Sequence, residues 1–215
     1  MLTGNPRQCP HEKFVHAEYT IAIEEYKKLA DQVNKIAQYN LGVIFSHGKG
    51  TSKDLSKGLK WHTLAAKQGY VDSQYALGIM FDNGMGTSQD YKEAVRWYRL
   101  AAEKGHTKAQ YNLASMLDEG IGAIQDYKEA VRWYQLAAEK GDNLAQNNLG
   151  TMYERGRGVL QDMVFAHMWY NIAASDGNEL ASKNRDMVLK KMTPSQIEKA
   201  QDLARECVKK NYKGC

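Results

Sequence analysis

Apolar and polar residues follow a helical period along most of this chain. In the stretch AQYNLASMLDEG, Ala109, Leu113, Met116 and Leu117 fall at i, i+4, i+7 and i+8, which is the spacing of one apolar helix face. The glycines of the following GIG end this pattern, because glycine is unfavourable inside helices and tolerates positive φ. The pattern predicts an amphipathic helix from 109 to about 120.

A second helix is predicted after this break. Asp126 and Glu129 have the spacing of a capping-box-like pair, which satisfies backbone N–H groups at a helix start. Trp133 and the alanine pair at 137–138 continue one apolar face, and Gly141 has the position of a C-terminal cap. The two stretches therefore predict a helix–turn–helix unit.

This unit recurs every 36 residues. The string QDYKEAVRWY occurs at 89–98 and again at 125–134, and the tryptophans and GxG turns share the offset. A fixed period of this length indicates a repeat protein. The repeated positions, which we interpret as structural, are Trp61, Trp97, Trp133, Trp169, Gly48, Gly50, Gly84, Gly86, Gly120, Gly122, Gly156 and Gly158.

The period also predicts how the chain is divided. We expect four full repeats at 37–72, 73–108, 109–144 and 145–180, preceded by a partial repeat at 17–36. Residues 1–16 form an N-terminal extension that we expect to be disordered, and 181–215 form a half-repeat and a capping helix that begins near Thr193 and Pro194. Because a pair of short helices cannot bury its apolar faces alone, we expect the pairs to stack into an all-α superhelical solenoid.

Composition narrows the class of function. The net charge of +4 is too small to indicate nucleic-acid binding, and no apolar run is long enough to span a membrane. The six histidines show no HxxxH spacing and no Ser/His/Asp grouping is evident, so we expect no catalytic residue, metal or cofactor. The GxG turns follow helices and recur four times, which favours a structural role over a phosphate-binding loop.

The segments AQYNLGVIFSHGKG, SQYALGIMFDNGMG, AQYNLASMLDEGIG and AQNNLGTMYERGRG, each followed by a tryptophan and an alanine pair, resemble the Sel1-like repeat family. This family is related to tetratricopeptide repeats, and the resemblance covers residues 17–212. It implies a right-handed superhelical α/α solenoid that acts as a scaffold or adaptor for protein or peptide partners. Ala114 replaces the usual glycine of the third repeat, and Asn147 replaces the tyrosine of the fourth.

The resemblance leaves a second functional class open. Some cysteine-rich relatives are linked to β-lactam hydrolysis or to the cell wall, but this chain lacks their paired repeat cysteines. Its cysteines are Cys9, Cys207 and Cys215; the last two could pair in an exported protein, although nothing in the sequence requires it. No signal peptide is visible, so we expect a cytoplasmic monomer, with a periplasmic or secreted protein as the alternative if the N-terminus is trimmed.

A row of asparagines, 36 residues apart except at Ala76, indicates where a partner binds. In tetratricopeptide relatives an asparagine on the first helix can bind peptide backbone or a terminal carboxylate in the concave groove, since an amide has both donors and an acceptor. The alternative is a local structural hydrogen bond. The candidate groove residues are Tyr39, Asn40, His47, Tyr75, Ile79, Asp82, Tyr111, Asn112, Asp118, Glu119, Asn148, Thr151, Glu154, Arg155 and Asn184, and the carboxylates at 82, 118, 119 and 154 suggest a partly basic partner.

Overall fold

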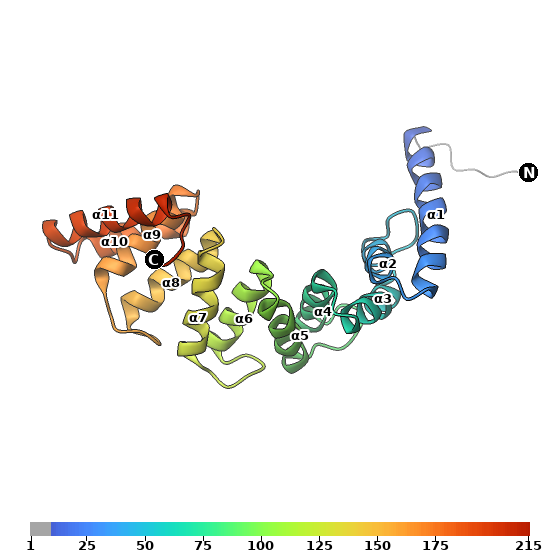
Figure 1. The fold of residues 1–215 in the computed structure, drawn as a ribbon, viewed down its shortest axis with the longest axis horizontal. Helices are drawn as coiled ribbons and strands as arrows, with labels where there is room; N and C mark the ends of the chain where they lie inside the picture. Colours follow the sequence, from blue (N-terminus) through green and yellow to red (C-terminus); the bar gives the residue numbers. More distant parts are fainter. Residues whose placement is uncertain (1–9) are drawn as a thin grey trace, which may run out of the picture. The chain divides into compact units, whose positions relative to one another are not determined.

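The computed structural model describes the backbone of residues 10–215 and the side chains of residues 19–215. This part of the chain contains eleven α-helices and no strand (Figure 1). The all-α class predicted from the 36-residue period is confirmed. The helices are α1 (Pro10–Asp31), α2 (Lys35–His47), α3 (Leu55–Lys67), α4 (Val71–Asn83), α5 (Tyr91–Glu103), α6 (Thr107–Glu119), α7 (Tyr127–Ala138), α8 (Asn143–Arg155), α9 (Met163–Ser175), α10 (Glu179–Leu189) and α11 (Pro194–Lys209).

The helices form two compact units, an N-terminal unit of residues 1–97 and a C-terminal unit of residues 98–215. In the N-terminal unit, α2 packs against α1 and α3, and α3 packs against α4. In the C-terminal unit, α6 to α9 pack in chain order, and α9 also contacts α10 and α11. The boundary between the units lies inside α5.

Helix α1 begins at Pro10 and includes residues that we assigned to the N-terminal extension. The rest of that predicted extension, residues 1–9, lies outside the described residues. From Ile23 to Ala30, α1 supplies buried side chains to the core of the first repeat. The helix therefore performs the packing role predicted for the second half of a partial repeat.

The two glycines of each GxG turn have different roles, which the last turn illustrates. Gly156 caps α8 at φ 65°, and its N–H donates to the carbonyl of Met152. Gly158 has φ 70°, and a Cβ there would lie 2.3 Å from the carbonyl oxygen of Tyr127 at the start of α7. The first glycine is needed for backbone conformation, and the second also for close approach to the preceding repeat.

A buried glutamine joins each repeat to the preceding one. Its Nε2 donates to the carbonyl of an alanine in the last turn of the preceding second helix, eight residues earlier. Gln146, for example, is fully buried and donates to Ala138 at 3.3 Å. Each of these alanine carbonyls also accepts a backbone N–H three residues later, so the buried amide adds a second hydrogen bond at the end of the preceding helix. The four pairs are Gln38–Ala30, Gln74–Ala66, Gln110–Ala102 and Gln146–Ala138.

The C-terminal helix begins as the sequence predicts. Thr193 and Gln196 form a reciprocal capping box, with Pro194 at the first helical position. A disulfide joins Cys207 of α11 to Cys215, and the hydroxyl of Tyr212 between them donates to Asp176 at 3.2 Å. The last residues of the chain are thereby tied to α11 by a covalent bond and to the end of α9 by a hydrogen bond.

Candidate binding face on the first helices

The predicted groove residues lie on the first helices of the repeats, namely α2 and α4 in the N-terminal unit and α6, α8 and α10 in the C-terminal unit. We call the surface that carries them the first-helix face. The helices present these side chains because Leu41, Leu77, Leu113 and Leu149 turn their opposite sides into the core, where each is fully or almost fully buried. Most of the predicted residues are partly exposed, and His47, Glu119 and Arg155 are exposed.

In the N-terminal unit, aromatic rings build this face on α2. The ring of Tyr39 lies 4.9 Å from that of Tyr70 and 5.7 Å from that of His62. His62 is buried, with its Nδ1 3.4 Å from the hydroxyl of Ser73, and burial lowers its pKa to about 4. The imidazole is therefore neutral at physiological pH and acts as a packed ring. His47, at the end of α2, contacts the carbonyl of Val43 at 2.9 Å through Nδ1.

The remaining groove residues of the N-terminal unit lie on α4. Tyr75, Ile79 and Asp82 are partly exposed. The carbonyl of Asp82 accepts a 2.7 Å hydrogen bond from Gln89 in the turn that follows α4. Asn83 donates to the carbonyl of Ile79 at 3.0 Å, which is a local contact typical of a polar side chain near a helix end. The turn is thus tied to the last residues of α4.

In the C-terminal unit, amide groups link neighbouring first helices. The Nδ2 of Asn148 donates to the hydroxyl of Tyr134 at 3.0 Å, and its Oδ1 accepts from Asn147 at 3.2 Å. The Oδ1 of Asn147 in turn accepts from Asn184 of α10 at 3.0 Å. Asn147, which replaces the repeat tyrosine, is buried and connects α8 to α10. Two members of the predicted asparagine row, Asn148 and Asn184, therefore make structural hydrogen bonds.

The other two members of the asparagine row have no such contacts. Within the part of the chain that the structure describes, the side chains of Asn40 and Asn112 form no hydrogen bond, although both are partly exposed. Asn112 lies beside Tyr111, whose ring is 6.0 Å from that of Tyr134. The amide of Asn112 thus has its donors and its acceptor available to a ligand.

A second network on α8 surrounds Glu154. Its carboxylate accepts from the hydroxyl of Tyr170 at 3.0 Å and from Lys191 at 3.3 Å. Thr151 lies 3.0 Å from the same tyrosine hydroxyl. Burial is the main cause that raises the pKa of Tyr170, so the hydroxyl stays protonated and donates. Glu154 is therefore held in one orientation by Tyr170 and Lys191, and Thr151 in turn positions the tyrosine hydroxyl.

The remaining acidic residues of the face also have partners. Asp118 lies 3.8 Å from Arg157, and desolvation raises the pKa of its carboxyl despite this cation. Glu119 accepts from the hydroxyl of Ser115 at 3.2 Å. Arg155 is exposed at the end of α8. Asp118 and Glu154 thus each have a cationic neighbour, which weakens a purely electrostatic attraction for a basic partner, whereas the partner of Glu119 is a neutral hydroxyl.

The predicted structural residues lie where the repeat packs. Trp97 and Trp169 are buried, while Trp61 and Trp133 are partly buried, and the indole N–H of Trp133 donates to Glu129 at 3.1 Å. Sequence reasoning did not single out the glutamine row of the fold, although its 36-residue period was a usable signal. The tyrosines that follow three of the tryptophans, Tyr98, Tyr134 and Tyr170, are each only 1% exposed.

Among the described residues, no group of three or more His, Cys, Asp and Glu side chains is arranged to hold a metal ion. The same residues contain no helix with the length and apolar character of a bilayer span.

Curated proteins match a short part of the chain. DAP3-binding cell death enhancer 1 of Mus musculus and its counterpart in Rattus norvegicus are each 42% identical over 48 residues. These matches span 22% of this chain and only 9% of the length of each relative. They indicate a shared repeat and carry no conclusion about the whole relatives.

Solved structures match most of the chain. A Sel1 repeat protein from Oxalobacter formigenes superposes with a TM-score of 0.69 at 30% identity, over 88% of this chain and 84% of that one. A protective antigen of uropathogenic Escherichia coli with an SLR fold gives a TM-score of 0.57 at 30% identity, over 87% of this chain and 49% of that one. Both support the predicted solenoid of helical repeats.

The model of the Sel1 repeat matches residues 35–70, 71–106, 107–142 and 143–178. These repeats begin two residues earlier than the repeats deduced from the period alone, and each starts at or next to the first residue of a first helix. The resemblance noted in the sequence is confirmed, and the chain belongs to the Sel1 repeat family.

Proposed function

We propose that this protein is a non-enzymatic adaptor whose first-helix face binds an extended segment of a partner protein. Proteins of this family generally serve as interaction scaffolds. The observation that carries the proposal is the contrast within the asparagine row: Asn148 is fixed by Tyr134 and Asn147, whereas Asn112 keeps its amide available. The hydrogen-bonded Asn148 holds the surface in place, and the amide of Asn112 has no hydrogen-bond partner among the described residues, so together they form a pre-organised site for a peptide unit.

The geometry favours recognition of main chain over recognition of charge. An amide offers an acceptor and two donors, which match the N–H and C=O of an extended peptide whatever its side chains. Asp118 and Glu154 are paired with Arg157 and Lys191, so their charge is largely compensated. The partner segment would therefore be selected mainly by fit and by its backbone, with the exposed Arg155 as a secondary contact.

Photo-crosslinking tests the proposal. A photoreactive phenylalanine at Tyr111 should capture a partner that mass spectrometry identifies, and the crosslinked residues should lie on one extended segment of it. Binding of the corresponding synthetic peptide, measured by calorimetry, should weaken about tenfold in Asn112→Ala, because a hydrogen bond or two to peptide groups is lost.

A matched variant separates binding from stability. Asn83→Ala makes the same substitution at an exposed asparagine whose side chain forms only a local hydrogen bond, to the carbonyl of Ile79. It should leave peptide affinity within about twofold, since no contact of the site is lost. Unchanged affinity in Asn112→Ala, or crosslinks scattered over the partner, would overturn the proposal.

We also propose that the chain works in an oxidising compartment, which corresponds to the exported alternative named above. The Cys207–Cys215 disulfide supports this, because such bonds are rare where glutathione keeps thiols reduced. Alkylation of protein from its native host, followed by mass spectrometry of the C-terminal peptide, should find both cysteines unmodified. Two alkylated cysteines would contradict the proposal without touching the adaptor function.

A further inference from the structure

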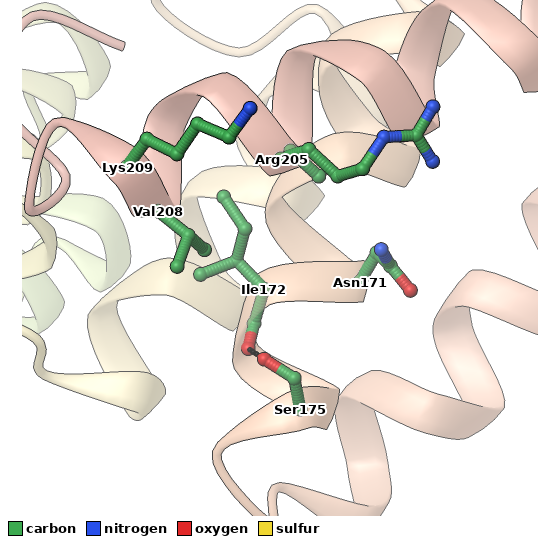
Figure 2. A pocket seen from close by; sticks show the side chains of 7 residues that line it. Asn171, Ile172, Ser175, Arg205, Val208 and Lys209 are labelled. Atoms are coloured by element: carbon green, nitrogen blue, oxygen red, sulfur yellow. Dashed lines mark hydrogen bonds between the residues drawn. The ribbon is translucent and has the colours of Figure 1, made fainter.

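A hollow of about 430 Å³ lies between α9 and α11 (Figure 2). It is on the second-helix and cap side of the C-terminal unit, and none of the predicted groove residues lines it. Asn171, Ile172 and Ser175 contribute from α9. The equivalent positions one repeat earlier include Gln135 and Glu139, whose side chains are longer. Short side chains on α9 therefore help to leave this space open.

Helix α11 supplies an apolar wall and two cations. Ala204 and Val208 face the hollow, and Val208 is 46% exposed. Arg205 and Lys209 stand one turn apart at its edge, as Figure 2 shows. Among the described residues Lys209 forms no ion pair. Arg205 is paired with Asp202 three residues earlier, and both side chains are well exposed, so the pair is weak and exchangeable.

Polar groups of α9 offer both a donor and an acceptor. The Oδ1 of Asn171 accepts from Arg185 at 3.4 Å, which orients the amide so that its N–H₂ group remains for a ligand. The hydroxyl of Ser175 donates to the carbonyl of Ile172 at 2.7 Å, so its oxygen remains as an acceptor. A peptide unit can use both groups, whereas a fatty acid has a carboxylate and no donor for Ser175.

We propose that this hollow binds a short segment of a partner protein in which an aliphatic side chain is followed by a carboxylate. The aliphatic side chain lies against Val208 and above Ile172, and the carboxylate reaches Lys209 and Arg205. The hollow has the volume of small-ligand and peptide pockets, and its two lining cations face no lining carboxylate. The site is separate from the first-helix face, so the protein would join two partner segments.

Fluorescence anisotropy with labelled octapeptides tests this site directly. The full-length protein should bind a peptide of alternating Leu and Glu at least about tenfold more tightly than peptides of alternating Leu and Lys or of Ser and Glu, since only the first supplies both apolar contact and negative charge. Equal binding of the Ser and Glu peptide would overturn the proposal, because charge alone would then explain it.

Charge reversal provides the second part of the test. The double variant R205E/K209E should weaken binding of the Leu and Glu peptide at least about tenfold and should gain affinity for the Leu and Lys peptide. The control K199E makes the same type of change on an exposed residue of α11 outside the hollow, and should alter affinity by less than about twofold. An equal loss in K199E would show non-specific attraction and overturn the site.

Discussion

The first and last full repeats build the surfaces of their first helices with different chemistry. In the repeat at 35–70, the face consists of rings, with Tyr39 packed between His62 and Tyr70. In the repeat at 143–178, the position of Tyr39 is taken by Asn147, which joins an amide network across α8 and α10. Ring contacts tolerate a broader range of distances and angles than amide hydrogen bonds do, so the geometry of the last repeat is the more tightly fixed of the two.

The second helices show the same contrast. His62 and Tyr170 occupy equivalent positions, and each lies against a glycine of the first helix, where an added Cβ would be 2.7 Å from its ring. The hydroxyl of Tyr170 reaches Glu154, whereas the equivalent of Glu154 in the first repeat is Ser46, whose buried hydroxyl has no hydrogen bond among the described residues. One repeat frame thus accepts an imidazole or a phenol, and only the phenol connects the core to the first-helix face.

Truncating the two rings should produce the largest difference. Tyr170→Ala should lower the free energy of unfolding by about 4 kcal/mol, because it removes a fully buried ring and one of the two donors to Glu154. His62→Ala should cost about 2 kcal/mol, because the imidazole is smaller and its one hydrogen bond is long. Urea denaturation followed by circular dichroism measures both. Equal costs would break the comparison between the repeats.

The pH dependence of stability should distinguish the repeats next. The pKa of His62 is about 4 in the folded state and 6.5 in the unfolded state, so the unfolded chain binds more protons between these values. The contribution of the neutral His62 to the free energy of unfolding is fully present above pH 6.5. Up to about 3 kcal/mol of that stability is lost as the pH falls from 6.5 to 4. Urea titrations at several pH values measure this loss.

The control for this prediction is His62→Tyr, which installs the residue that the other repeats carry. Ser46 occupies the position at which Glu154 accepts from Tyr170, so it is the expected partner of the new hydroxyl. The variant should lose most of the difference in unfolding free energy between pH 6.5 and pH 4. Burial also lowers the pKa of His167, which therefore adds a residual dependence of the same sign in both proteins. A slope unchanged by the substitution would place the titrating group elsewhere.

Substitutions in the GxG turns should destabilise both units to the same extent, since the turns, unlike the first-helix residues, are built in the same way in each unit. Gly86→Ala and Gly158→Ala should each cost about 2 kcal/mol, because a Cβ meets a backbone carbonyl of the preceding repeat. Gly177→Ala, with positive φ and open space around it, should cost about 1 kcal/mol. Thermal denaturation of the variants ranks their destabilisation. If Gly158→Ala costs no more than Gly177→Ala, close approach of Gly158 to the preceding repeat does not matter for stability.

The smallest expected effect concerns the amide network. Asn148→Ala should lower stability by about 1 kcal/mol, since Tyr134 and Asn147 each lose a partner, while Asn112→Ala should change it by less than about 0.5 kcal/mol. Chemical denaturation of the two variants side by side provides the measurement. A cost at Asn112 as large as at Asn148 would show that both asparagines are structural.

Repeat period and capping chemistry made most of the fold predictable. The Asp126 cap, the first glycine of each turn and the capping box at Thr193 depend on contacts within a few residues, so the sequence alone was sufficient. The same period predicted the same role for every asparagine of the row, since Asn112 and Asn148 occupy equivalent positions in the sequence. Only Asn148 has a buried neighbour, Asn147, in place of a tyrosine, and that neighbour redirects its amide.

The sequence by itself determined the helices, their 36-residue order and the residues that face the core, because helix periodicity and turn chemistry are local. The tertiary structure alone decided which amides remain for a partner, how the carboxylates of the first-helix face are compensated, and that a hollow opens between α9 and α11. These features depend on contacts such as Asn184–Asn147 and Lys191–Glu154, each 37 residues apart in the chain. Contacts of that range arise only when one repeat is stacked on the next.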